Sequence, residues 1–217
     1  MVEPASPLRI LTVPTQVRII ALQVAADLVV LAGCVWAAVG LRQAVAAWFP
    51  ISMPPGQAGG LFLAMLLVPI GLFASGSYPG YGQRGVERMR RRLKVVAAAA
   101  ALAGAFDYLV QDNYWSRGVL VAAFALAAVA VPVADALLRE LLVAWRWWGL
   151  PVVLVGDAEA VRRTAGLLAA QAHTGYRPVG ALVHGGGEVG LPVFADAMAA
   201  RAAAGPAAAA VVALGRT

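Results

Sequence analysis

Four long apolar runs, almost free of charged side chains, constrain this chain more than any other feature of its sequence. They cover residues 19–41, 57–76, 93–111 and 118–143. Each run can cross about 30 Å of hydrocarbon as a helix, because a membrane span needs about 20 apolar residues. The composition agrees, since 61% of the residues are hydrophobic and only 13% are charged. A soluble domain has about 25% charged residues, so the composition excludes an ordinary soluble enzyme.

The positive charge of the chain is concentrated between the second and third apolar runs. From Arg84 to Lys94, six basic residues accompany one acid, Glu87, so this segment supplies +5 of the net charge of +6. Basic loops of membrane proteins face the cytoplasm. With four spans, both termini, including segment 1–18, are then cytoplasmic. We expect no nucleic acid as a partner, because no aromatic-rich binding motif accompanies the local charge.

The last third of the chain, residues 149–217, has a different pattern. Short runs of β-branched residues alternate with a helical period, which is typical of parallel, Rossmann-like sheets. The fold class is therefore mainly α, a four-helix transmembrane bundle in domain 19–148 followed by a partial α/β Rossmann-like domain. In that second domain we expect strands over 151–156, 177–184 and 208–214, and a helix over 158–172.

Gly156 ends the first predicted strand, at the place where dinucleotide-binding folds hold phosphate against a helix N-terminus. The full fingerprint is G-x-G-x-x-G, and only its first glycine is present. Asp157 and Glu159 would also place negative charge where a pyrophosphate lies. Gly156 and Asp157 are therefore interpreted as the remnant of a nucleotide loop within a structural strand–turn–helix.

Few side chains offer catalytic chemistry. The chain has one cysteine, Cys34, and two histidines, His173 and His184. Neither a metal-ligand spacing nor a nucleophile–base arrangement is recognisable. We therefore predict no catalytic residue, no metal site, no cofactor and no intrachain disulfide in this chain.

Charged residues near the ends of the spans suggest two hypotheses. Basic side chains at the inner leaflet can contact anionic headgroups, including the phosphate of a polyprenyl lipid, or can merely set the topology. Asp27 and Asp135 lie within apolar runs, where ionisable groups are costly and usually paired. We expect Asp27 to make an interhelical hydrogen bond and Asp135 to pair with Arg139. The candidate headgroup contacts are Arg88, Arg90, Arg91, Arg92 and Lys94.

Two motifs resemble a known family. Tyr78-Pro79-Gly80-Tyr81-Gly82, followed by Val86-Glu87-Arg88-Met89-Arg90-Arg91, resembles the motif after the second span of bacterial polyprenyl-phosphate hexose-1-phosphate transferases. These include the undecaprenyl-phosphate galactose phosphotransferases. Val153-Leu154-Val155-Gly156 with Gly175-Tyr176-Arg177-Pro178-Val179-Gly180 resembles their central CoA-binding-like domain. The resemblance covers nearly the whole chain.

The resemblance implies a phosphoglycosyl transfer that starts exopolysaccharide, O-antigen or capsule synthesis. The family moves a hexose 1-phosphate from a UDP-sugar to undecaprenyl phosphate, using an Asp–Glu pair and Mg²⁺ in a C-terminal domain. Nothing in this chain matches that domain. We therefore expect the chain to be the membrane-anchoring and regulatory part of such an enzyme, inactive alone and catalytically dependent on a missing domain.

The resemblance also implies a location and partners. The chain is expected in the bacterial inner membrane as a multi-pass homo-oligomer, with polyprenyl phosphate and UDP-sugar bound only through the missing domain. The second motif is shared with membrane nucleotide-sugar 4,6-dehydratases, whose N-terminal part is one alternative. A stand-alone, non-enzymatic membrane scaffold or regulator is another.

Overall fold

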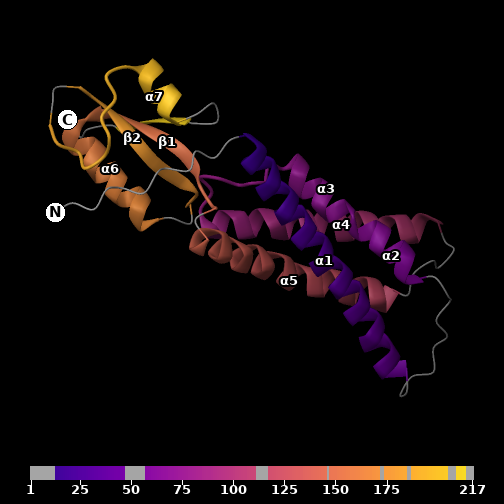
Figure 1. Cartoon of the computed structure of the whole chain (residues 1–217). Helices are drawn as coiled ribbons and strands as arrows, with labels where there is room; N and C mark the ends of the chain where they lie inside the picture. The colour runs from indigo at the N-terminus through magenta and orange to yellow at the C-terminus, as the bar shows by residue number, and fades with distance from the viewer. Residues whose placement is uncertain are drawn as a thin grey trace. The chain divides into compact units, whose positions relative to one another are not determined.

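The computed structural model describes residues 13–46, 57–110, 117–145, 147–171, 174–184, 187–204 and 209–213. The chain divides into two compact units (Figure 1). We call Ile20–Leu138 the helical unit, and Met1–Ile19 with Arg139–Thr217 the α/β unit. Residues 1–12 of the expected N-terminal segment lie outside the described residues.

The helical unit is built from the apolar runs. Two helices are long and apolar enough to cross a membrane, over Gln16–Val45 and Arg117–Ala144. Their mean hydropathies are 2.2 and 2.3, by length and composition alone. The helices of this part of the chain are α1 (Val13–Ala46), α2 (Gln57–Met65), α3 (Leu67–Ala74), α4 (Gly85–Val110) and α5 (Arg117–Ala144).

The second apolar run forms two short helices, whereas the sequence predicted one span over 57–76. The helix is interrupted at Leu66, between α2 and α3. Pro69 has no N–H to donate to the carbonyl of Met65, four residues earlier, so one helical hydrogen bond is lost there. The Leu66 amide instead lies within hydrogen-bond distance of both Phe62 and Leu63 carbonyls, at 3.2 and 3.1 Å. Leu66 itself keeps right-handed helical dihedrals, with φ −63° and ψ −17°, so α2 and α3 follow one another with a single turn residue between them.

The third apolar run is the second half of a longer helix. α4 begins at Gly85, eight residues before the predicted start at 93, so it includes the basic segment. Its inward face recurs every three or four residues, and its buried residues are Arg88, Arg92, Val96, Ala99, Ala103 and Asp107.

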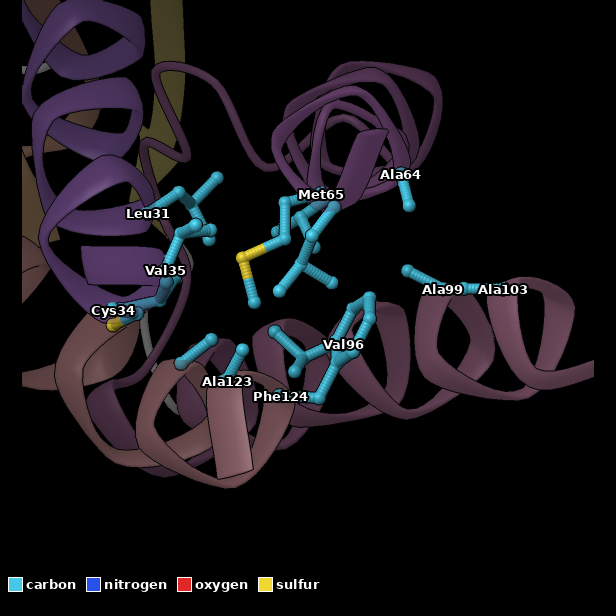
Figure 2. Packing of buried hydrophobic residues seen from close by; sticks show 14 of the residues in the cluster. Leu31, Cys34, Val35, Ala64, Met65, Val96, Ala99, Ala103, Ala123 and Phe124 are labelled. Carbon is cyan, nitrogen blue, oxygen red and sulfur yellow. The ribbon is translucent and has the colours of Figure 1, made fainter. Parts of the chain in front are cut away.

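The core of the helical unit is formed by side chains from all its helices (Figure 2). Met65 lies between α1 and the α4–α5 pair, and is fully buried. Ala99 of α4 lies opposite Ala64 of α2 (Figure 2), and small residues allow helices to approach closely. Phe124 of α5 lies beside Val96 of α4.

The α/β unit holds the predicted parallel sheet. Its three described strands have the order β2-β1-β3, and both pairings are parallel. Helical segments connect successive strands, as parallel pairing requires. The observed strands begin and end within one or two residues of the predicted ones. The elements are β1 (Leu150–Asp157), α6 (Ala158–Ala170), β2 (Tyr176–His184), α7 (Ala197–Ala204) and β3 (Ala209–Ala213).

Both faces of the sheet are packed. Val152 and Leu154 of β1 contact Val161 of α6 on one face. Val153 packs with Ala200 of α7 on the other. This arrangement explains why β1 is a continuous apolar run, because a parallel strand is buried on both sides.

Candidate functional site: a buried ion-pair cluster

Asp27 is the one charged residue of the first apolar run, and it points into the helical unit. On α1 the buried positions Gln23, Asp27 and Leu31 recur every four residues and form one inward stripe. Asp27 is only 2% exposed. An aspartate held there needs a partner from another element, because a buried charge without one is costly.

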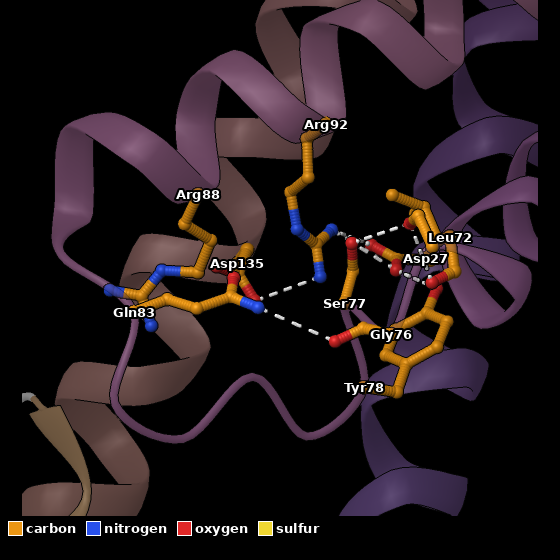
Figure 3. A network of polar contacts seen from close by, with 10 residues as sticks. Asp27, Leu72, Gly76, Ser77, Tyr78, Gln83, Arg88, Arg92 and Asp135 are labelled. Atoms are coloured by element: carbon orange, nitrogen blue, oxygen red, sulfur yellow. Dashed lines mark hydrogen bonds and ion pairs between the residues drawn. The ribbon is translucent and has the colours of Figure 1, made fainter.

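Arg92 of α4 is that partner. Its Nη1 donates to both carboxylate oxygens of Asp27, at 3.0 and 3.1 Å, and its Nη2 donates to Oδ1 of Asp135 on α5, at 2.9 Å (Figure 3). The side chain of Arg92 is 1% exposed. One guanidinium therefore connects three helices. A planar fork of donors suits this task, which a lysine could not perform with the same geometry.

Arg88 adds a second cation, one helical turn before Arg92. Its Nε lies 3.7 Å from Oδ2 of Asp135. Burial lowers the pKa of Arg88, the Asp135 carboxylate opposes that shift, and the positive charge of Arg92 adds to it. Two arginines and two aspartates make the cluster formally neutral, which limits the cost of holding four charges away from water.

Tyr78 closes the cluster from the loop between α3 and α4. Its hydroxyl donates to Oδ2 of Asp27, and its ring lies 5.7 Å from the Arg92 guanidinium carbon. Burial and then the negative charge of Asp27 raise the pKa of Tyr78, so the phenol stays protonated and remains a donor. The loop turns at Gly76, Gly80 and Gly82, whose φ angles of 66°, 69° and 75° favour glycine.

The loop is tied to both of its neighbouring helices. The Ser75 hydroxyl donates to the Leu72 carbonyl at 3.0 Å. Arg91 Nη1 donates to the Ser75 carbonyl at 2.9 Å. These bonds hold the start of the loop that carries Tyr78 against α3 and α4.

Some polar atoms beside the cluster have no hydrogen-bond partner in the described part of the chain. They include both side-chain polar atoms of Gln23, Nη1 of Arg88 and Nε of Arg92. Among the described residues, no group of three or more His, Cys, Asp or Glu could hold a metal ion. Both carboxylates of the cluster are held by the Arg92 guanidinium. The cluster is an electrostatic connection between α1, α4, α5 and the loop, and we call it the lock. Its members are Asp27, Tyr78, Arg88, Arg92 and Asp135.

The structure divides the basic side chains that the sequence grouped together. Arg88 and Arg92 are buried in the lock, whereas Arg90 and Lys94 are exposed. Arg91 is half-buried, with an ion pair to Glu87 at 3.7 Å besides its bond to Ser75. Headgroup contact stays a prediction, and only the outward residues are placed for it.

The motif Tyr78–Gly82 forms bends and turns, and Tyr78 and Gly80 are buried in the unit. The Asp27 hypothesis holds in its geometry, because Asp27 bonds to residues of two other segments. Sequence reasoning missed Arg92 as the partner. The sequence did hold a signal for this pairing, because Asp27 and Asp135 lie in apolar runs and an excess of arginines directly precedes another run. The pairing of Asp135 with Arg139 stays a prediction.

Gly156 and Asp157 lie at the carboxyl end of β1, as predicted. Asp157 is the N-cap residue of α6 and makes no side-chain capping bond. Glu159 in the first turn pairs with Arg163 at 2.9 Å. Gly187 lies against the same helix start, where an added Cβ would come within 2.7 Å of the Ala158 Cβ. The N-terminus of α6 is therefore next to the backbone at Gly187 and to the acidic residues Asp157 and Glu159.

Comparison with known proteins adds no assignment. No protein-family model matches the chain, and no curated protein is similar to it.

Proposed function

We propose that the helical unit is a four-helix membrane module. The observation that supports this best is its inverted polarity, because the unit buries an ion-pair cluster and exposes large apolar side chains. A soluble protein does the reverse. Exposed apolar side chains occur on every long helix, and they include Val29, Trp36, Ile70, Phe73, Leu102, Leu109, Val121, Val129 and Leu137.

The position of the lock along each helix supports the same proposal. From Asp27 to the end of α1 there are 19 residues, from Arg92 to the end of α4 there are 18, and from the start of α5 to Asp135 there are 18. At 1.5 Å per residue, these stretches are about 27–28 Å long. α2 and α3 together cover residues 57–74, about 26 Å, and end beside the lock. All four match the hydrocarbon thickness of about 30 Å.

The lock would then lie at one boundary of the bilayer, next to the basic segment. Basic residues favour the cytoplasmic side. This arrangement supports a multi-pass protein of the bacterial inner membrane with both termini in the cytoplasm, where the α/β unit would also lie.

We further propose that this module anchors and regulates a polyprenyl-phosphate sugar-phosphate transferase. The support is the resemblance of its Tyr78–Gly82 motif, whose first residue is part of the lock. UDP-sugar, polyprenyl phosphate and Mg²⁺ would be bound by a catalytic domain outside residues 1–217, and a homo-oligomer is the proposed assembly. The chain itself would position that domain at the inner leaflet.

Membrane insertion is tested by alkaline extraction and by cysteine labelling. In a Cys34→Ala background, Arg84→Cys and Arg117→Cys introduce thiols at the opposite ends of the proposed spans. A membrane-impermeant maleimide added to intact spheroplasts should label position 117 and spare position 84. Labelling of both positions, or release of the chain by carbonate, would overturn the membrane topology.

The transferase role needs an activity test. The purified chain, incubated with UDP-sugar, undecaprenyl phosphate and Mg²⁺, should release no UMP. Adding a separately expressed catalytic domain of this family should give turnover that increases when the chain is present. Turnover by the chain alone would refute the division of roles, and no effect on the added domain would favour a stand-alone scaffold.

A further inference from the structure

The basic segment of α4 has two opposite faces. Arg88 and Arg92 are one turn apart and point into the helical unit. Arg90 and Lys94 are also one turn apart and are exposed. Residues two positions apart differ by about 200° around a helix, so the two pairs lie on nearly opposite sides.

The two faces differ in whether the chain supplies their counter-ions. The buried pair is balanced by Asp27 and Asp135. The side chains of the exposed cations Arg84, Arg90 and Lys94 make no ion pair or hydrogen bond with the rest of the described residues. The outward charge is therefore left for an anion that does not belong to the described chain.

This outward charge does not help the helix itself. Cations near a helix N-terminus are unfavourable, because that end carries a partial positive charge. Glu87 is the one acid in the first turn of α4. Arg84 at the helix start opposes the helix dipole, and the side chains of Arg84, Arg90 and Lys94 lack partners among the described residues, so their placement points to a role outside the fold.

Apolar side chains accompany the exposed cations. Val86 is 68% exposed and Met89 is 52% exposed in the first turns of α4. A helical segment that mixes exposed cations and exposed apolar residues is typical of the boundary between headgroups and acyl chains. Because Arg92 belongs to the lock and lies two residues after Arg90, the lock sets where this segment lies relative to the proposed bilayer boundary.

We propose that Val86, Met89, Arg90 and Lys94 on one face of α4, together with the exposed Arg84 directly before the helix, bind the anionic phospholipid headgroups of the bilayer. The phosphates pair with the cations, and Val86 and Met89, which precede Arg92 in α4, lie among the headgroups on the water side of the lock. This inference rests on the proposed membrane insertion and adds to it a lipid class and a set of residues. It assigns Arg88 and Arg92 to the lock alone.

The test measures lipid binding to the purified full chain in a neutral detergent. Phosphatidylglycerol or phosphatidylcholine is titrated at low salt, and bound lipid is counted by native mass spectrometry. The variant Arg90→Gln with Lys94→Gln should bind phosphatidylglycerol about 30-fold more weakly, since each basic residue near an anionic surface contributes about fivefold. Phosphatidylcholine binding should not change. Inorganic phosphate at equal concentration should not displace the lipid.

A matched control removes the same charge elsewhere. Arg162→Gln with Arg201→Gln alters two exposed arginines of the α/β unit, and it should leave phosphatidylglycerol binding unchanged. Equal loss in both double variants would show a net-charge effect and overturn the proposal. So would equal affinity of the unaltered chain for the two lipids, or displacement by free phosphate. A chain that resists alkaline extraction but fails these tests refutes the headgroup face and leaves the membrane module standing.

Discussion

Replacing Arg92 by methionine should destabilise the helical unit more than any single change of an exposed residue. Arg92 is 1% exposed and donates three hydrogen bonds, two to Asp27 and one to Asp135. Methionine keeps much of the volume but leaves two buried carboxylates without this cation. Breaking a buried pair in this way costs about 3–5 kcal/mol. Proteins are stable by about 5–15 kcal/mol, so the loss is a large fraction of the total.

The assay is equilibrium unfolding of the purified chain in detergent, followed by the fluorescence of its six tryptophans. Arg90→Met is the matched control, because Arg90 is exposed on the opposite side of the same helix. It should change the free energy of unfolding by no more than about 0.5 kcal/mol.

A double-mutant cycle isolates the ion pair itself. Arg92→Met and Asp27→Asn, singly and together, should show a coupling energy of about 1–3 kcal/mol, because the two side chains share direct hydrogen bonds. Strictly additive losses would refute the lock, and so would an Arg92→Met variant as stable as the unaltered chain.

Three further predictions concern single positions. Tyr78→Phe should destabilise by about 1.5–3 kcal/mol, because a hydrogen bond to a charged group is lost. Because the pKa of Tyr78 is raised in the folded chain, its contribution to stability is complete below about pH 10 and is lost as the pH rises further. The free energy of unfolding should therefore fall less steeply with alkaline pH in Tyr78→Phe than in the unaltered chain. Identical alkaline slopes would contradict this. Gln23→Met should stabilise the chain by about 1 kcal/mol in the same unfolding assay, because the buried Gln23 amide makes no hydrogen bond among the described residues, and a loss of stability would show that the amide is satisfied by water. Gly180→Ala should destabilise the α/β unit by about 1–3 kcal/mol, because an added Cβ would lie 2.2 Å from the Phe194 ring. The loss is measured as a lower thermal midpoint by circular dichroism. Gly166→Ala in helix α6 is the control and should not destabilise, because its added Cβ meets open space.

The sheet could be predicted closely, because its signals are local. The apolar run at 151–156 ends at a glycine, and a helical period follows it at once. Both features depend on residues within a few positions of each other. β1 accordingly covers Leu150–Asp157, as expected.

The helical unit was predicted in outline only. Periodicity shows which side of a helix is inward, but it does not show which side chain on another helix it meets. Arg92 and Asp27 are 65 residues apart, and nothing local links them. The basic segment was interpreted as a topology signal, and this interpretation did not anticipate that two of its arginines, Arg88 and Arg92, are buried. The interruption at Leu66 depends on how the helix accommodates the missing backbone N–H of Pro69, which composition does not determine.

The lock also imposes an order on biosynthesis. A ribosome delivers Asp27 first, then Arg88 and Arg92, and Asp135 last. Counting only these four side chains, the formal charge inside the growing assembly is −1 after α1, +1 after α4 and zero only when α5 arrives. A chain that stops before α5 therefore lacks Asp135, the carboxylate that pairs with both Arg88 and Arg92, and keeps one uncompensated positive charge among these groups.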